Sequence, residues 1–239
     1  MAMDNMILMV RGHEIWLEAS KVKDRSVELG LFYGHNMIVD GCPDPKNLSP
    51  AVYGPEGEKI VPKVTSKKDV HSLRVKADKD GYYTAVVDLS PETYSNTRKE
   101  GYKSGPKSMY KDVVYAGAWH QMAKTIFAVG GSGRYRAEPV HGILDIVPGE
   151  ARPRVGTVLE LTVYFEGKKL EGAEIKAVSK KEGREMAEVT TGKGGVARVP
   201  INAGGPWMFL ARHRDPGRAV PDQYDEAVFV TTLTLEAVK

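Results

Sequence analysis

Cysteine is almost absent from this chain, which has 239 residues and a single thiol, Cys42. One thiol cannot form an internal disulfide, and it cannot supply the two or more thiolates of the common structural zinc sites. Cys42 stands in the turn-like segment DGCPDP without a basic neighbour that would stabilise a thiolate. We therefore expect an exposed but inert thiol.

Long apolar runs and long basic runs are also missing. No stretch approaches the roughly 18 apolar residues of a membrane span, so no membrane-spanning segment is predicted. Residues 1–12 contain a short apolar stretch, Met6–Val10, without a basic leader or an A-x-A-like cleavage site, and they do not form an intact signal peptide. The net charge is +3 and the basic residues are scattered, which argues against nucleic acid as a partner.

The familiar catalytic motifs are absent as well. The chain has no GxSxG and no HExxH, and the segment TGKGG lacks the spaced glycine and the hydroxyl residue of a P-loop. The segment GGSG at 130–133 has no strand before it and helix after it that would make a phosphate cradle. No two carboxylates can be paired as acid and base from sequence. We do not expect an enzyme.

Strand patterns dominate what is present. In VELGLFYGH (27–35) alternate residues from Val27 to His35 share one face, and in TVLELTVYFEG (157–167) the shared face runs from Leu159 to Phe165. The best helix candidate, residues 113–127, is rich in β-branched and aromatic residues, which leaves it open between a short helix and a strand. The sequence predicts an all-β fold with at most one or two short helices.

A polar, proline-broken segment, GEARPRVGT, follows Pro148 and is interpreted as an interdomain linker. It separates a β-rich domain of residues 1–148 from a domain of residues 149–239. The second part contains short strand patterns at close spacing without a helix between them, which is typical of a sandwich of about seven antiparallel strands. We expect two β-sandwich domains, the second of them transthyretin- or Ig-like.

Two early histidines are the strongest candidates for metal ligands. His13 and His35 each lie near one end of a predicted strand, and each directly follows a glycine, which would let another backbone or a ligand come close. His35 is in phase with Leu31 and Tyr33, so its imidazole should face an apolar layer and need a partner. His120, in AGAWHQMAK, is either a third ligand or a residue of the site wall.

The other histidines have simpler interpretations. His213 is in phase with apolar residues and is interpreted as a strand-end residue at the sandwich edge. His71, after SKKDV, is expected to be solvated, and His141 is expected to be structural. Glu14 should point to the opposite face of its strand from His13.

The order of several segments resembles one family. GHEIWLEAS, FYGHNM, DGYYTAVVDLSP, AKTIFAVGG…ILDIVP and LTVYFEGKKLEGAEIKAVS…TTGKGGVARVPINAGGPWMFLARH together resemble DUF4198, extracytoplasmic components associated with cobalt and nickel ABC-type uptake systems. The C-terminal half also resembles transthyretin-like sandwiches of the carboxypeptidase-regulatory or Cna-B type. The resemblance implies His13 and His35 as metal ligands, whereas the match around His120 is approximate.

The resemblance implies a non-catalytic protein outside the cytoplasm that binds a divalent transition metal and delivers it to membrane transporter subunits. Nickel or cobalt is the expected metal, with zinc or copper as alternatives, because imidazole nitrogen suits all four. Tyr33, Trp16 and Trp119 are candidates to line the site. The alternative is a protein- or glycan-binding interaction module with structural histidines; a hydrolase with a metal-bound water is a third class.

Overall fold

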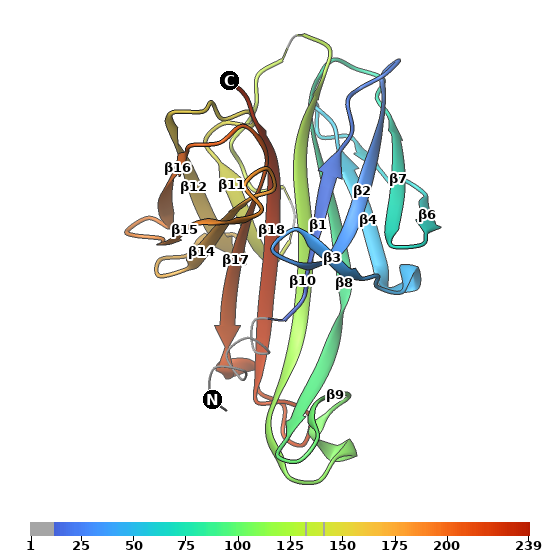
Figure 1. Ribbon diagram of the computed structural model, residues 1–239, viewed down its shortest axis with the longest axis vertical. Coiled ribbons are helices and arrows are strands. Elements are labelled where there is room, and N and C mark those ends of the chain that lie inside the picture. Colours follow the sequence, from blue (N-terminus) through green and yellow to red (C-terminus); the bar gives the residue numbers. More distant parts are fainter. Residues whose placement is uncertain (1–11, 132, 141) are drawn as a thin grey trace.

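The computed structural model describes residues 12–131, 133–140 and 142–239, which form an all-β fold (Figure 1). Those ranges contain three one-turn 3₁₀ helices, η1 (Pro45–Asn47), η2 (Lys107–Met109) and η3 (Pro216–Arg218), and no α-helix. The strands are β1 (Glu14–Ala19), β2 (Ser26–His35), β3 (Ile38–Gly41), β4 (Leu48–Tyr53), β5 (Lys59–Ile60), β6 (Val64–Lys67), β7 (Val70–Lys76), β8 (Gly81–Thr97), β9 (Gly101–Ser104), β10 (Val113–Val129), β11 (Leu144–Pro148), β12 (Thr157–Phe165), β13 (Lys168–Lys169), β14 (Glu174–Ser179), β15 (Arg184–Thr190), β16 (Val196–Ile201), β17 (Gly205–Asp215) and β18 (Glu226–Ala237). The predicted fold class is confirmed.

Within the described residues the strands form three sheets, which enclose two large hydrophobic cores and two smaller clusters of buried apolar side chains. A nine-stranded sheet has the order β15-β14-β17-β18-β10-β8-β4-β5, with β9 added to β8. The five-stranded sheet β1-β2-β7-β6, with β3 on β2, packs on its β10-β8-β4 portion around residues such as Leu17, Leu31 and Tyr83. The four-stranded sheet of β11, β12, β13 and β16 packs on the β14-β17-β18 portion around Leu161 and Phe209. Alternation of apolar residues along β2 and β12 supplies the inner faces of both cores.

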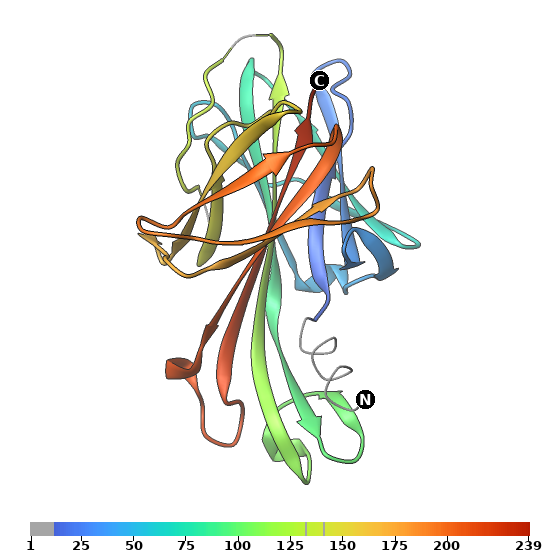
Figure 2. The ribbon, with the colours of Figure 1, turned by 60° about the vertical axis from the view of Figure 1, so that its left-hand side comes forward.

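A parallel pairing joins the two halves of the chain. β10 and β18 lie side by side in Figures 1 and 2, and their register runs from Gly117↔Glu226 to Thr125↔Thr234. The nine-stranded sheet therefore contributes one portion to each sandwich. β11, which precedes the proposed linker, pairs with β12, which follows it. The domain boundary at residue 148 stays a prediction.

Residues 113–127, whose sequence is compatible with either a short helix or a strand, belong to the strand β10. Its central residues are buried on both faces, because it lies between β8 and β18 and the sheet is covered on either side. A strand buried on both faces shows no period of two. The absence of alternation, rather than a helical period, made residues 113–127 ambiguous.

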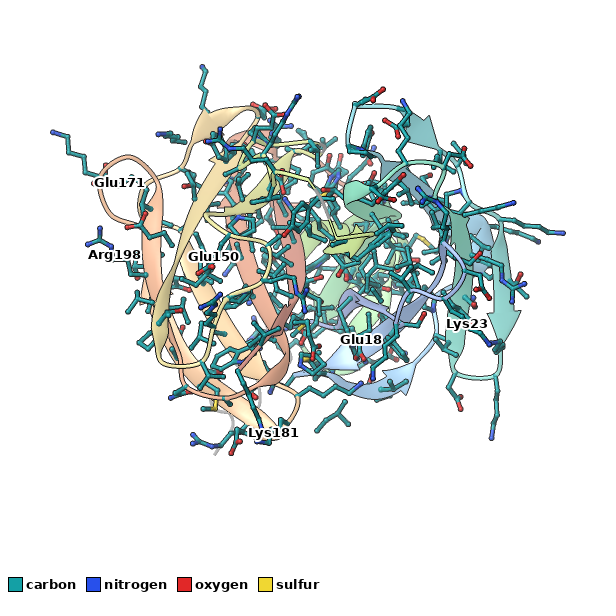
Figure 3. All side chains as sticks on the ribbon, turned by 90° about the horizontal axis from the view of Figure 1, so that it is seen from above. Glu18, Lys23, Glu150, Glu171, Lys181 and Arg198 are labelled. Carbon is teal, nitrogen blue, oxygen red and sulfur yellow. The ribbon has the colours of Figure 1, made fainter. Side chains whose placement is uncertain are left out.

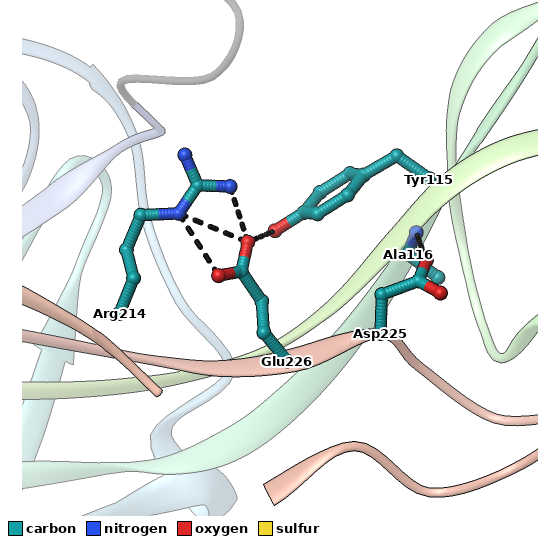
Figure 4. Close-up of polar contacts among 5 residues, drawn as sticks. All are labelled: Tyr115, Ala116, Arg214, Asp225 and Glu226. Carbon is teal, nitrogen blue, oxygen red and sulfur yellow. Dashed lines mark hydrogen bonds and ion pairs between the residues drawn. The ribbon is translucent and has the colours of Figure 1, made fainter. Parts of the chain in front are cut away.

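A buried carboxylate, that of Glu226, connects the start of β10, the end of β17 and the start of β18. Glu226 of β18 accepts hydrogen bonds from the Tyr115 hydroxyl at 2.7 Å and from Nε of Arg214 at 2.9 Å (Figure 4). Beside it, Asp225 accepts from the backbone N–H of Ala116 at 2.8 Å. Because Glu226 is only 8% exposed, these partners compensate its desolvation, and they fix the ends of β10, β17 and β18 together.

Charged side chains lie around the outside of both sandwiches. Seen from above, Lys23 marks the edge of one sandwich and Glu171 and Arg198 the edge of the other (Figure 3). Within the described residues, no helix has the length and apolar character needed to cross a membrane.

Candidate functional site

Two imidazoles and a carboxylate converge where β1 begins and the β2–β3 hairpin turns. His13 Nε2 lies 3.1 Å from Asp40 Oδ1, and His35 Nδ1 lies 2.7 Å from Asp40 Oδ2. One ligand atom from each residue falls within 4.8 Å of the others. The three side chains are about two-fifths exposed, at 40%, 42% and 41%. They can close on one ion by small rotations, since metal–nitrogen and metal–oxygen bonds are about 2.0–2.2 Å.

The hairpin places Asp40 through an irregularity that strand patterns do not reveal. Asn36 and Met37 form the two-residue turn with φ of 51° and 64°, the left-handed values of a type I′ hairpin. His35 pairs with Ile38 and Gly34 with Val39, but Tyr33 then pairs with Gly41. Asp40 is the extra residue of this β-bulge. A bulge re-aims a side chain, and here the Asp40 carboxylate reaches both imidazoles.

The glycines before the two histidines allow other atoms to approach the backbone closely, as predicted. A Cβ on Gly34 would lie 2.0 Å from the backbone oxygen of Ile38 across the hairpin. Gly12 has φ of +47°, and a Cβ there would lie 3.3 Å from the Trp119 ring. Only glycine adopts both geometries without strain.

We expect Gly34→Ala to lower the free energy of unfolding by roughly 1–3 kcal/mol or more, because the methyl group would collide with backbone that cannot move without opening the turn. Gly131→Ala is the control, since a Cβ at Gly131 meets nothing within 4 Å. Urea denaturation of both variants measures the effect. Equal unfolding midpoints for the two would contradict the assigned close approach.

The imidazoles border a cavity of about 660 Å³. Its wall combines aromatic rings with a few polar groups: Gly12, His13, Glu14, Tyr33, His35, Asn36, Tyr94, Tyr102, Ser104, Trp119, Gln121 and Lys176. The Tyr33 ring stacks on His13 with centroids 4.6 Å apart and an interplanar angle of 2°. Tyr33 and Trp119 were both predicted to line the site.

A polar chain anchors the turn from both sandwiches. Glu14 of β1, 2% exposed, accepts a hydrogen bond from the backbone N–H of Asn36 at 2.6 Å. Lys176 of β14 donates from Nζ to Asn36 Oδ1 at 2.7 Å. The β2–β3 hairpin, which carries His35 and Asp40, is thus held by the N-terminal strand and by the C-terminal sandwich. Glu14 lines the same cavity as His13 but is not one of the three residues of the His13, His35 and Asp40 cluster.

Burial and neighbouring charges set the protonation of the site. Desolvation and the adjacent His35 lower the pKa of His13, against the opposing influence of Asp40, so the ring is neutral and able to donate a lone pair near pH 7. Burial raises the pKa of Glu14, and burial together with the Glu92 carboxylate raises the pKa of Tyr33 to about 12. A neutral imidazole is the form that binds metal.

A comparison with models of protein families shows the family to which the chain belongs. The model of DUF4198, described as a domain of unknown function, matches residues 10–215. The chain belongs to the DUF4198 family. A search of functionally curated proteins finds no match to this DUF4198 chain.

Solved structures that share features with this DUF4198 protein are distant. The FdeC adhesin of Escherichia coli is 16% identical, with 95% of this chain and 64% of that chain covered and a TM-score of 0.26. A tandem-repeat structure from the extending region of a large adhesion protein is 13% identical, with 94% and 49% covered and a TM-score of 0.25. Murine CEACAM1b is 12% identical, with 94% and 100% covered and a TM-score of 0.24. The chain spans less than two thirds of the first two structures.

His120, the predicted possible third ligand, lies outside the cluster of this DUF4198 protein. Its ring stacks on Phe229 with centroids 4.7 Å apart. His213 joins the same aromatic group through Phe165, at 4.3 Å, and Arg218 lies 5.2 Å from the Phe229 ring. Burial and the Arg218 charge lower the pKa of His120; burial and Arg218 also lower that of His213, against the raising influence of Asp215.

These two histidines should make the stability of the protein fall in mild acid. In the folded protein the pKa values of both histidines lie below the ordinary value of 6.5. At a pH between a lowered folded pKa and 6.5, the unfolded chain therefore binds more protons than the folded chain. The free energy of unfolding should therefore decrease as the pH drops below about 6.5 towards the folded pKa values. Urea midpoints between pH 8 and pH 5 should show a shallower decrease in a His120→Gln/His213→Gln variant. An unchanged profile would contradict the assignment.

Four other side chains were the subject of sequence predictions, and three of them lie within the described residues. The prediction that His71 is solvated was wrong: it is 2% exposed, and its Nε2 lies 2.8 Å from the Pro43 carbonyl oxygen, because the segment after β3 covers it. Trp16 is buried against Phe32 and does not line the cavity. Cys42 is exposed, as expected, but its Sγ lies 3.2 Å from Nε2 of His71, a basic neighbour that the local sequence does not show. Partial desolvation of the thiol raises its pKa. His141 lies outside the described residues.

Sequence reasoning missed three polar members of the site. Asp40 could have been suspected from its place after the GHNM turn, but only the bulge turns it towards the histidines. Gln121 and Lys176 line the cavity from β10 and β14. Nothing in the local sequence links them to residues 13–40, because the sheet packing alone brings them there.

Proposed function

We propose that this protein binds one divalent transition metal through His13, His35 and Asp40 and delivers it, without catalysis, to a membrane metal-uptake transporter. The observation that supports the proposal is the convergence of the three donor atoms within 4.8 Å. Two imidazole nitrogens and a carboxylate oxygen suit nickel(II) and cobalt(II), with zinc(II) and copper(II) as competitors.

The chemistry of the cluster suits a cargo site better than a structural one. It has three protein donors and partly exposed side chains, so coordination positions stay open for exchange. A closed four-ligand site leaves no open coordination position for exchange, and the one cysteine lies outside this cluster. Delivery places the protein outside the cytoplasm, next to importer subunits.

Calorimetric titration of the metal-free protein with nickel(II), cobalt(II) and zinc(II) tests the proposal. We expect one saturable site, lost in the His13→Ala/His35→Ala variant. The His120→Ala/His213→Ala variant is the matched control, because it removes two imidazoles that lie outside the cluster, and it should bind as the parent protein does. Equal binding by all three proteins would refute the ligand assignment. No binding to the parent would favour an interaction module with structural histidines.

A further inference from the structure

The cavity beside the histidines is much larger than an ion. Its volume of about 660 Å³ lies in the range of small-molecule pockets, roughly 300–1,000 Å³, whereas a water molecule takes about 30 Å³. The two imidazoles line this space, but Asp40 does not. The two imidazole rings therefore border a chamber with room for an organic molecule beside the three donor atoms.

The charges of the site favour an occupant with one negative charge. A divalent ion bound to Asp40 keeps one uncompensated positive charge beside a mainly aromatic wall. The other charged residues that line the cavity, Glu14 and Lys176, are of opposite sign and act on each other, as the influence of Lys176 on the Glu14 carboxyl shows. Burying an unpaired charge is costly. A monoanionic ligand on the metal would make the group neutral.

The number of metal-binding atoms in the cluster and the residues that line the cavity indicate the class of ligand more specifically. The protein offers three donor atoms, and a tridentate amino acid with amine, carboxylate and imidazole donors adds three more to complete an octahedral set. The flat faces of Tyr33, Tyr94 and Trp119 can pack on a ring and a short carbon chain. Gln121 and Lys176 offer the amide and ammonium groups that hydrogen-bond amino and carboxylate groups.

From these observations we infer that the cargo is a one-to-one chelate of the metal with an α-amino acid bearing a side-chain donor, rather than the bare ion. The amino acid fills the cavity, while His13, His35 and Asp40 hold the metal. This inference rests on the proposed metal site and specifies its substrate class.

Equilibrium dialysis with nickel(II) and L-histidine tests the inference, with nickel(II) alone as the parallel arm. We expect one histidine to be retained per nickel ion and per protein chain, and no histidine without nickel. In the arm that contains histidine, nickel retained with no histidine bound, or nickel removed from the protein by histidine, would overturn the chelate and leave the metal site standing. No nickel retained in either arm would overturn the proposed function and the chelate with it.

A cavity-filling variant separates the chelate from the metal site. Ser104, an exposed residue of β9, lines the cavity but is not one of the three proposed ligands. Ser104→Trp should therefore abolish histidine retention and leave the binding of nickel alone unchanged. Lys103→Trp is the matched control, because adjacent side chains of a strand point to opposite faces, and it should retain both. Undiminished histidine retention by the Ser104→Trp protein would place the amino acid elsewhere and refute the inference.

Discussion

Lys124→Met is expected to lower the free energy of unfolding by about 3–5 kcal/mol, one of the largest effects of any single substitution in this protein. Lys124 of β10 forms an ion pair with Asp145 of β11, and both side chains are 2% exposed. Burial lowers the Lys124 pKa while Asp145 opposes the shift. The second carboxylate oxygen of Asp145 has no hydrogen-bond partner within the described residues. Removal of the Lys124 ammonium group would leave the Asp145 carboxylate buried without a compensating charge.

A double-mutant comparison shows whether the unpaired charge causes the loss. Lys124→Met/Asp145→Leu should recover most of the stability, because replacing a buried pair with apolar residues is often neutral or stabilising. Arg198→Met, which removes the same type of contact from the exposed pair with Glu160, should leave the urea midpoint nearly unchanged. A double variant no more stable than Lys124→Met would show that the damage comes from packing and not from charge.

Asp40→Asn is expected to weaken nickel binding by roughly 10–100-fold, the loss typical when a group that orients metal-ligating histidines is removed, and by more if the carboxylate coordinates the ion directly. The amide keeps the size of the side chain but loses the charge that lies 3.1 Å from His13 and 2.7 Å from His35. Because Asp40 is 41% exposed, the unfolding midpoint should not change. Titration calorimetry gives the affinity and urea denaturation gives the stability.

Asp69→Asn is the control for Asp40→Asn, since it removes an exposed carboxylate outside the histidine cluster. It should bind nickel as the parent protein does. If both variants lost affinity equally, the cause would be the general negative potential of the surface, and Asp40 would have no specific role.

The sequence alone determined most of the local structure. Alternation of apolar residues in Val27–Leu31 and Leu159–Val163 predicted buried strand faces, because side chains of a strand have a period of two. The glycine before His35 predicted a close backbone approach, and the structure has Ile38 at that place. The two early histidines could be paired as candidates because each lies at one end of a predicted strand. In the structure His13 directly precedes β1, His35 ends β2, and these strands are neighbours in one sheet.

Tertiary structure decided the rest. Asp40 joins the histidines through a bulge, whose register depends on the partner strand and leaves no periodic trace in sequence. Trp16, His71 and Lys124 are buried by segments distant in the chain, so their own neighbours could not reveal their environment. The pairing of β10 with β18 and the contact of Lys176 with Asn36 are likewise long-range. Short-range patterns set which face of a strand is apolar, but only the assembled sheets determine which side chains meet.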